Sequence, residues 1–196
     1  MAFLRSVSAD TGPAIHGDGV FLRIPQMGDF PAWAALREES RAFLTRWEPT
    51  WPVDDLTRSA FRRRIRRYVQ DVRDDVAYPF FVFDADDTLI GGATLSNIRR
   101  GVTQSTSLGY WVGASHARQG YMSAAVAAII PFVFEQLRLH RLEAACLPSN
   151  AASIRLLEKV GFSREGYARR YLRINGVWQD HFLYAMLSDD PRPERP

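Results

Sequence analysis

Two stretches of the sequence place polar groups at the expected start of a helix, where anion binding and proton donation are both chemically feasible. The first runs from Ser115 to Ser123 and reads SHARQGYMS. Successive backbone N–H groups at a helix start have no intrahelical partner, so they bind phosphate well. The stretch contains neither GxxxxGK[ST] nor GxGxxG, which argues against a nucleotide P-loop and a dinucleotide fingerprint. We expect a phosphate site formed by backbone groups around Gly120, with a plain turn as the alternative.

The second stretch begins at Pro148 and reads PSNAASIRLLEKVGF. Asn150 is suited to cap the helix that follows, because its side-chain oxygen can accept a backbone N–H of the first turn. Ser153 carries a hydroxyl in that same turn, where it can donate to a leaving group or simply bond to the backbone. Gly161 is expected to end this helix.

Carboxylates that could act as a general base are few. Glu48 lies in the segment WEPTWP, and Glu143 lies in RLEAACL. For each glutamate the alternative is a substrate-positioning or structural role, such as pairing with an arginine. Asp180 and His181 are neighbours on an expected strand and therefore face opposite sides of it. We expect them to form a buried hydrogen-bonded pair and not a general base.

Other kinds of site find no support in the sequence. The four histidines are scattered and Cys146 is the single cysteine, so neither a metal-ligand spacing nor a disulfide framework is present. The GxSxG elbow of serine hydrolases is absent. Strand alternation places Cys146 in the interior, where we expect an inert small hydrophobic residue.

Hydrophobic periodicity predicts the elements that would position these groups. Helices are expected over 29–40, from Asp54 or Asp55 to 72, over 120–137 with a kink at Pro131, and over 150–159. Strands are expected over 20–24, 78–84, 88–98, 106–113, 141–147, 162–174 and 177–187, with an Asn175-Gly176 turn joining the last two. This order implies an α/β (α+β) fold with a mixed, mostly antiparallel sheet and helices packed on both sides.

Length and composition fit one domain of ordinary size. The chain has 196 residues, of which 46% are hydrophobic and 24% charged, with a formal net charge of +3. This composition excludes extended disorder and does not by itself require nucleic acid. We expect a flexible N-terminal arm over 1–19, one domain over 20–187 and a flexible tail over 188–196. No apolar run approaches the roughly 20 residues that span a bilayer, so we expect no membrane association and a cytoplasmic location.

The motifs taken in order resemble one family. GYWV, a turn with GY opening a helix, LHRLEA and NxxSxxxLEKxGF are similar to the GNAT N-acetyltransferase superfamily. WEPTWP near the start and EGYARRYLRINGVWQDHFLYA near the end resemble its ribosomal-protein-alanine N-acetyltransferase branch. The resemblance covers about 20–187 and implies a GNAT-like fold with acetyl-CoA as co-substrate. It further implies direct acetyl transfer, in a ternary complex, to the N-terminal α-amine of a protein or peptide such as a ribosomal protein.

The resemblance also implies where the cofactor binds. The expected contact residues are Trp111, Val112, Arg118, Gln119, Gly120, Tyr121, Met122, Ser123, Asn150 and Ser153. Ser153 matches the position that donates to the CoA sulfur, while Leu157 stands where another branch of the superfamily has a tyrosine. The phosphate loop departs from the family pattern at Ala117 and Met122, and the larger Met122 side chain could crowd the loop.

The acceptor side is expected on the WEPTWP segment, because its tryptophans and prolines form a stiff amphipathic stretch. We expect Trp47, Glu48 and Trp51 to border the acceptor groove. The catalytic candidates are Ser153, Glu48 and Glu143, and no metal is expected.

Two alternatives to protein N-terminal acetylation stay open at this point. The chain could acetylate a small amine or antibiotic, or it could be a non-catalytic module that binds CoA or RNA. The segment RSAFRRRIRRYV suggests a weak RNA contact, since Arg62, Arg63, Arg66 and Arg67 surround a stripe of Phe61, Ile65 and Val69. A solvated helix face is the usual explanation of such a run. The oligomeric state, monomer or dimer, is not specified by the sequence.

Overall fold

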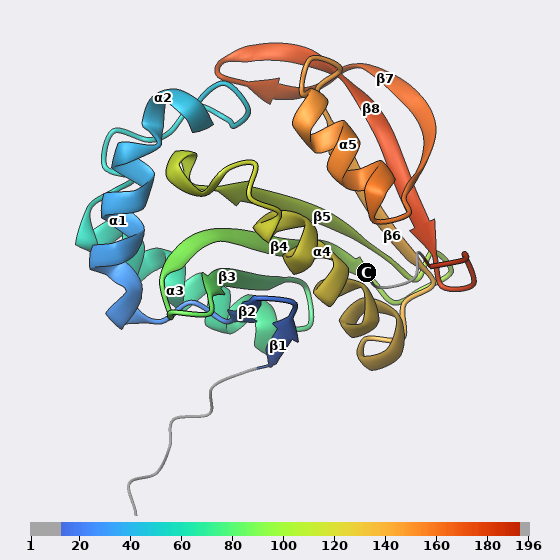
Figure 1. Ribbon diagram of the computed structural model, residues 1–196, viewed down its shortest axis with the longest axis horizontal. Coiled ribbons are helices and arrows are strands. Elements are labelled where there is room, and N and C mark those ends of the chain that lie inside the picture. The colour runs from blue at the N-terminus through green and yellow to red at the C-terminus, as the bar shows by residue number, and fades with distance from the viewer. Residues whose placement is uncertain (1–12, 193–196) are drawn as a thin grey trace, which may run out of the picture.

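Eight strands form one sheet in the computed structural model of this protein, which describes residues 13–192 (Figure 1). The strand order is β1-β2-β3-β4-β5-β6-β8-β7. The pair β5 and β6 is parallel, and every other neighbouring pair is antiparallel. The strands are β1 (Ala14–Gly17), β2 (Val20–Arg23), β3 (Tyr78–Asp84), β4 (Leu89–Arg99), β5 (Ser105–Val112), β6 (Arg141–Cys146), β7 (Ser163–Ile174) and β8 (Val177–Leu187).

The predicted N-terminal arm was wrong for its last residues. Residues 14–17 form β1, which pairs with β2 across a tight turn at Gly19, a residue with a φ of 64°. The side chain of Ile15 is buried in the larger hydrophobic core. A strand of four residues is stable here because it pairs with β2 along its whole length. The remainder of the predicted arm, residues 1–12, lies outside the described residues, as do residues 193–196 of the predicted tail.

Five α-helices and three shorter helical turns connect the described strands. The α-helices are α1 (Phe30–Glu39), α2 (Arg41–Leu44), α3 (Arg58–Arg73), α4 (Tyr121–Pro131) and α5 (Ala151–Lys159). The shorter turns are η1 (Met27–Asp29), η2 (Ala114–His116) and the π-helical turn η3 (Phe132–Gln136). The helical register therefore changes directly after Pro131, where the sequence predicts a kink.

The start of α3 differs from the prediction. Thr57 caps the helix, since its hydroxyl accepts the N–H of Ala60 at 3.2 Å. Asp54 and Asp55, the predicted caps, instead form ion pairs with Arg63 and Arg64, each nine residues further along the chain. Threonine is also a favoured N-cap residue, although aspartate ranks above it. The two adjacent aspartates were therefore the stronger candidates in the sequence.

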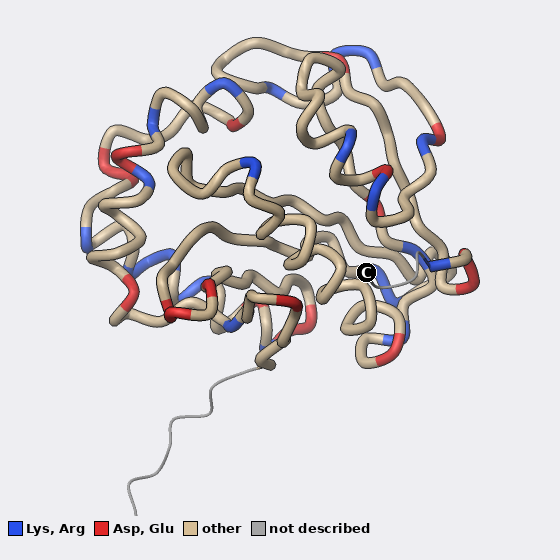
Figure 2. Tube along the Cα trace, viewed as in Figure 1, with Lys and Arg blue, Asp and Glu red and all other residues tan. Residues whose placement is uncertain are grey.

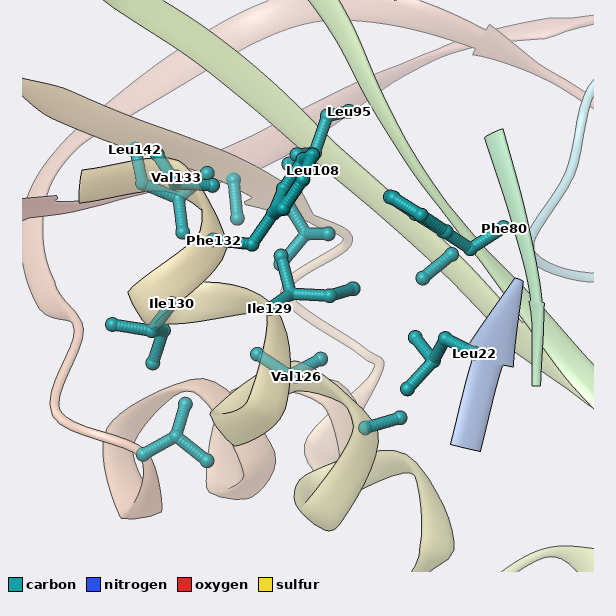
Figure 3. Close-up of a cluster of buried hydrophobic side chains, with 14 of the residues drawn as sticks. Leu22, Phe80, Leu95, Leu108, Val126, Ile129, Ile130, Phe132, Val133 and Leu142 are labelled. Carbon is teal, nitrogen blue, oxygen red and sulfur yellow. The ribbon is translucent and has the colours of Figure 1, made fainter. Parts of the chain in front are cut away.

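Two hydrophobic cores cover the two faces of the sheet. The larger core packs α4 and α5 against the strands and includes Leu22, Phe80, Val126, Ile129 and Leu142 (Figure 3). The smaller core packs α1 and α3 against the other face through Trp33, Phe61, Ile65 and Phe81. Val69, predicted to lie in the α3 stripe, is instead 48% exposed.

The predicted fold class is confirmed by this architecture: a mixed, mostly antiparallel sheet carries helices on both sides. Within residues 13–192, none of the helices is long and apolar enough to cross a membrane. Basic and acidic positions are interspersed along the chain in the view of Figure 2, in keeping with the small net charge.

Candidate active site

The parallel pair β5 and β6 opens part of the way along its length. Residues 105–108 of β5 pair with residues 141–144 of β6. Beyond these residues, β5 pairs with β4 alone and β6 with β8 alone, within the described part of the chain. The edge of residues 109–112 that faces β6 is therefore free of strand pairing, and its backbone groups can bond to an extended ligand.

Strand alternation gives the two faces of this opening different side chains. Tyr110 and Val112 pack toward the core formed by α4 and α5, while Trp111 packs toward the core formed by α1 and α3. The unpaired part of β5 thus presents side chains to both faces of the sheet, each packed in a different core.

The N-terminus of α4 lies just after the opened end of β5. Gly120 has a φ of 88°, a conformation that an L side chain rarely adopts. Its neighbour Arg118 also has a positive φ, 64°, and Gln119 donates its side-chain N–H to the Ser115 carbonyl at 2.8 Å. No side chain caps α4, so the N–H groups of Tyr121, Met122 and Ser123 point outward from its first turn. This arrangement of backbone donors is suited to bind an anion such as a pyrophosphate.

Met122 does not crowd that loop. Its side chain is buried in the larger core, and its Cε lies next to Gly91 on β4. Only its backbone N–H therefore remains at the loop, which is what anion binding requires. Ala117 lies earlier, in extended conformation directly after η2, and is half-buried.

The N-terminus of α5 lies on the other side of the opening. Asn150 caps the helix by accepting the Ser153 N–H at 3.1 Å. The Ser153 hydroxyl lies 2.6 Å from the Tyr110 hydroxyl, a contact that links α5 to the opened part of β5. Asn150 keeps its amide N–H groups for a ligand, because the cap uses only its oxygen.

Two buried polar groups, the Cys146 thiol and the Tyr110 hydroxyl, adjoin Ser153, and Tyr184 bonds to α5 further along that helix. Burial raises the pKa of Cys146 to about 11, and the adjacent Ser153 hydroxyl offsets part of that shift. Burial also raises the pKa of Tyr110 well above its ordinary value. Tyr184, whose hydroxyl donates to Glu158 at 3.1 Å, has its pKa raised to about 12, mainly by burial. All three groups stay protonated at neutral pH.

The opposite face of the opening is built around Arg37. This arginine is 6% exposed, and its guanidinium carbon lies 4.0 Å from the Trp51 ring centroid and 4.9 Å from that of Trp111. Trp111 in turn lies so close to Gly92 that a Cβ there would be 2.5 Å from the indole nitrogen. The glycine is what lets the indole lie flat against β4.

Glu48 is fixed by the same group. Its two carboxylate oxygens accept from Arg37 at 2.8 and 2.7 Å, and Trp51 donates its indole N–H at 2.7 Å. The Glu48 carbonyl accepts the N–H of Asn175, at the tip of the β7–β8 hairpin, at 2.9 Å. Both carboxylate oxygens are occupied by donors from the protein, so the geometry favours the positioning role over the catalytic role for Glu48.

The other predicted residues are less closely grouped. Trp47 is half-buried, with the Arg46 guanidinium over its ring at 5.1 Å, and is not part of the Arg37 group. Glu143 lies where β5 and β6 are still paired, and its carboxylate accepts from Arg141 at 2.7 Å. The structure does not bring Glu143 together with Ser153, because the two lie on opposite faces of the sheet.

The predicted Asp180–His181 pair does not form. Asp180 accepts hydrogen bonds from the Tyr167 hydroxyl and the Arg170 backbone N–H. His181 is 3% exposed and its Nδ1 lies 3.0 Å from the Gln179 carbonyl, so that nitrogen carries the proton. Opposite orientation on the strand, which the sequence did predict, is what keeps the two side chains apart.

Two residues of this site were missed in the sequence. Tyr110 stands inside the GYWV motif, but strand alternation reveals its face and not its partner on α5. Arg37 falls in a helix among other charged residues, and a buried arginine is rare enough that nothing in its spacing singles it out. Arg37 lies 11 residues before Glu48 in the sequence, and this spacing indicates an ion pair only when the path of the chain between them is known.

The arginine-rich helix α3 has mixed partners. Arg63 pairs with Asp54 and Arg64 with Asp55, while Arg62 and Arg66 are exposed. The RNA contact therefore stays a prediction. Within residues 13–192, we found no group of three or more histidine, cysteine, aspartate or glutamate side chains arranged to hold a metal ion.

Comparison with known proteins identifies this arrangement. The family described as "Acetyltransferase (GNAT) domain" matches residues 20–163. A probable N-acetyltransferase of Bacillus subtilis, YjcK, is 37% identical over 177 residues, which are 90% of this chain and 98% of that protein. The ribosomal protein uS5-alanine N-acetyltransferase of Escherichia coli is 35% identical over 170 residues, 85% of this chain and 88% of its own length.

The fold agrees with solved structures as well. Mycobacterium smegmatis RimJ in complex with CoA-disulfide has a TM-score of 0.85 and 30% identity, with 89% of this chain and 87% of that chain covered. The cofactor prediction is confirmed by these relationships, and the opening beside Tyr110 and the backbone donors of α4 are suited to it. The chain belongs to the GNAT acetyltransferase family, and it is an acetyl-CoA-dependent acetyltransferase related to the ribosomal-protein N-acetyltransferases.

Proposed function

We propose that this enzyme acetylates the N-terminal α-amine of a protein, with a ribosomal protein as the acceptor. The observation that carries the proposal is the similarity, over 85% of the chain, to a protein named as a uS5-alanine N-acetyltransferase. Relatives named for ribosomal-protein-serine acetylation support the same class of acceptor.

The cofactor in this proposal lies between β5 and β6. The backbone of Trp111 and Val112 bonds to the pantetheine arm, in place of the strand that β6 does not supply there. The N–H groups from Arg118 to Ser123 bind the pyrophosphate, and the Asn150 amide contacts the arm. When bound, acetyl-CoA supplies the activated acetyl thioester.

Ser153 is the proposed donor to the CoA sulfur. Its backbone N–H is used by the Asn150 cap, but its hydroxyl is not needed to end or begin the helix. As an amine attacks the thioester carbon and the C–S bond breaks, negative charge grows on the sulfur, and a hydroxyl placed there stabilises it. The proton lost by the amine passes to the sulfur by way of solvent.

The two glutamates predicted as general bases are both occupied by arginines, and this bears on the kind of acceptor. Glu48 and Glu143 are both held by arginines. An α-amino group has a pKa near ~7.7–8.0, so a substantial share is already neutral at physiological pH, whereas a lysine amine near ~10.4 is almost wholly protonated. A site without a strong base therefore suits an α-amine better than a lysine side chain.

The acceptor reaches the thioester from the Trp111 face in this proposal. The tip of the β7–β8 hairpin and the segment that holds Glu48 and Trp51 meet there. Their aromatic rings and the Arg37–Glu48 pair form a rigid wall along which an extended chain end can lie.

The test is mass spectrometry of defined substrates incubated with acetyl-CoA. We expect acetylation of a peptide with a free N-terminal alanine, and no reaction of the same peptide with a blocked N-terminus and an internal lysine. Reaction with the lysine alone, or with a small amine but neither peptide, would overturn the proposed acceptor class.

A further inference from the structure

The hydroxyls of Tyr110 and Ser153 form a hydrogen bond that joins β5 to α5 where β5 has separated from β6. Their oxygens are 2.6 Å apart. Tyr110 lies two residues beyond Leu108, the last residue of β5 that pairs with β6. It therefore stands at the point where the strands separate, on the same face of the sheet as α5.

The direction of this hydrogen bond decides what Ser153 can do. A hydroxyl has one hydrogen to donate and two lone pairs to accept with. If Ser153 donated to Tyr110, its hydrogen would be unavailable to any ligand. A phenol is the more acidic hydroxyl and hence the better donor, so we take Tyr110 as the donor in this pair. The Ser153 hydrogen is then left for the neighbouring Cys146 sulfur or for a bound ligand.

The surroundings keep the phenol neutral. The pKa of Tyr110 is raised by burial, and the groups near it are the Cys146 thiol and the Tyr184 hydroxyl, which is bonded to Glu158. None of these neighbours is a cation that would stabilise a phenolate. Tyr110 therefore keeps its proton, and because that proton is engaged with the Ser153 oxygen, the hydrogen bond can persist unchanged throughout the reaction.

We propose that Tyr110 is a positioning residue, which donates to the Ser153 oxygen and so directs the Ser153 hydrogen at the CoA sulfur. This inference rests on the proposed role of Ser153. No bond forms or breaks at Tyr110. The gain is orientation: the Ser153 donor does not have to be reoriented when charge develops on the sulfur.

Tyr110→Phe tests the proposal, because it removes one oxygen and keeps the ring. Tyr184→Phe is the matched control, since Tyr184 is also buried and also bonds to α5 through its hydroxyl, but to Glu158 instead of Ser153. Two quantities are measured for each variant: kcat with the N-terminal alanine peptide and with a small primary amine, and the pKa of the bound CoA thiol, followed by thiolate absorbance.

For Tyr110→Phe we expect kcat to fall roughly tenfold and the pKa of the bound CoA thiol to rise by about one unit, the loss of one oriented hydrogen bond. The KM for acetyl-CoA should stay within about twofold. Tyr184→Phe should change neither quantity. In a Ser153→Ala background, Tyr110→Phe should have almost no further effect, because the tyrosine acts through the serine.

Two outcomes overturn the inference: wild-type kcat and thiol pKa in Tyr110→Phe, or an equal loss with and without Ser153. The thiol pKa requires no acceptor, so it reports on Tyr110 even if the alanine peptide is not a substrate. Failure of the peptide alone would refute the proposed acceptor and leave the role of Tyr110 supported by the thiol measurement.

Discussion

The helix-capping role and the proposed catalytic role at the start of α5 fall on two different residues, Asn150 and Ser153. A serine in a first helical turn often forms hydrogen bonds with the backbone. Here the Asn150 side chain caps the helix by accepting the Ser153 backbone N–H, which would remain in Ser153→Ala. The hydroxyl therefore has the Tyr110 hydroxyl and the Cys146 thiol as its protein neighbours, and it is not needed to cap the helix.

Ser153→Ala is expected to lower kcat and kcat/KM together, by about 10- to 1000-fold, since a transition-state donor is lost. Because Tyr110 loses a partner, we also expect about 1–2 kcal/mol of lost stability. Calorimetry with CoA should show nearly unchanged affinity. Steady-state kinetics normalised to folded protein, with melting curves, separate the two effects: a lower melting temperature with normal turnover would assign Ser153 to structure alone.

The expected effect of replacing Glu48 follows from its hydrogen bonds to Arg37 and Trp51. Glu48→Gln leaves the buried Arg37 without its counter-charge, and we expect about 1–3 kcal/mol of lost stability together with a raised acceptor KM. The acetyl-CoA constants should not move, because the Arg37 group lies on the other face of the sheet.

Glu38→Gln is the matched control for that experiment. Glu38 lies next to Arg37 on α1 and pairs with Arg41 of α2, but both side chains are exposed. Its loss should therefore leave the melting temperature and both KM values as they are. An unchanged acceptor KM and kcat in folded Glu48→Gln would remove Glu48 from the acceptor site.

Some residues of the candidate site could be predicted from the sequence and others could not. It found Asn150, Ser153 and the Gly120 loop because each lies within a contiguous motif. It did not find Tyr110 or Arg37, whose importance depends on contacts with residues 43 and 11 positions away. Periodicity specifies the face of an element on which a side chain lies, and a long-range partner is specified only by how the elements pack.

Among the elements, the strands with strong local signals were predicted almost to the residue. YPFFVFD is β3, and the Asn175-Gly176 turn joins β7 to β8 with φ values of 44° and 81°. The strand β1 and the one-turn helix α2 were missed, because segments of four residues carry little periodicity and depend on their neighbours for stability.

The turn into α4 allows a test at this scale. Gly120→Pro cannot keep a φ of 88°, since proline fixes φ near about −65°. We expect CoA affinity to fall at least roughly tenfold because the backbone donors lose their convergence. Gly19→Pro is the control: it forces the same change on another positive-φ glycine, in the β1–β2 turn. Isothermal titration should show normal CoA binding in that variant, and equal affinity in both would place the phosphates elsewhere.

At the scale of the whole molecule, Asp75 joins parts that are distant in sequence. It accepts from the Arg100 guanidinium at 2.6 and 2.9 Å and from the Tyr78 hydroxyl at 3.0 Å, while Arg100 also donates to the Leu137 carbonyl. The end of α3, the start of β3, the β4–β5 connection and the segment after α4 meet at this carboxylate.

This junction predicts a pH dependence of stability. The hydrogen bond from Arg100 holds the pKa of Asp75 below its ordinary value. A depressed carboxyl pKa stabilises the fold above the unfolded pKa, near ~3.9, and this contribution is lost as pH falls through the folded pKa. Asp75→Asn should therefore lower the melting temperature at pH 7, and the difference from wild type should shrink below about pH 4.

Asp86→Asn, at an exposed turn position, is the comparison for that measurement and should show no such difference. A pH-independent effect of Asp75→Asn would mean that the side chain contributes through its shape and hydrogen bonds and not through its charge. Since the pair is partly exposed, high salt should weaken the effect.

Because β5 and β6 separate after residue 108, one side of residues 109–112 lacks a partner among the described strands although it lies in the middle of the sheet. Amide hydrogens along residues 109–112 on that side should exchange with deuterium faster than those of the fully paired β3–β4 ladder, although both lie in the middle of the molecule. Binding of CoA should slow exchange at 109–112 and in the first turn of α4, and leave β3–β4 unchanged. In this sense the ligand completes the sheet, and the protein has a more continuous hydrogen-bonded backbone during catalysis than it has alone.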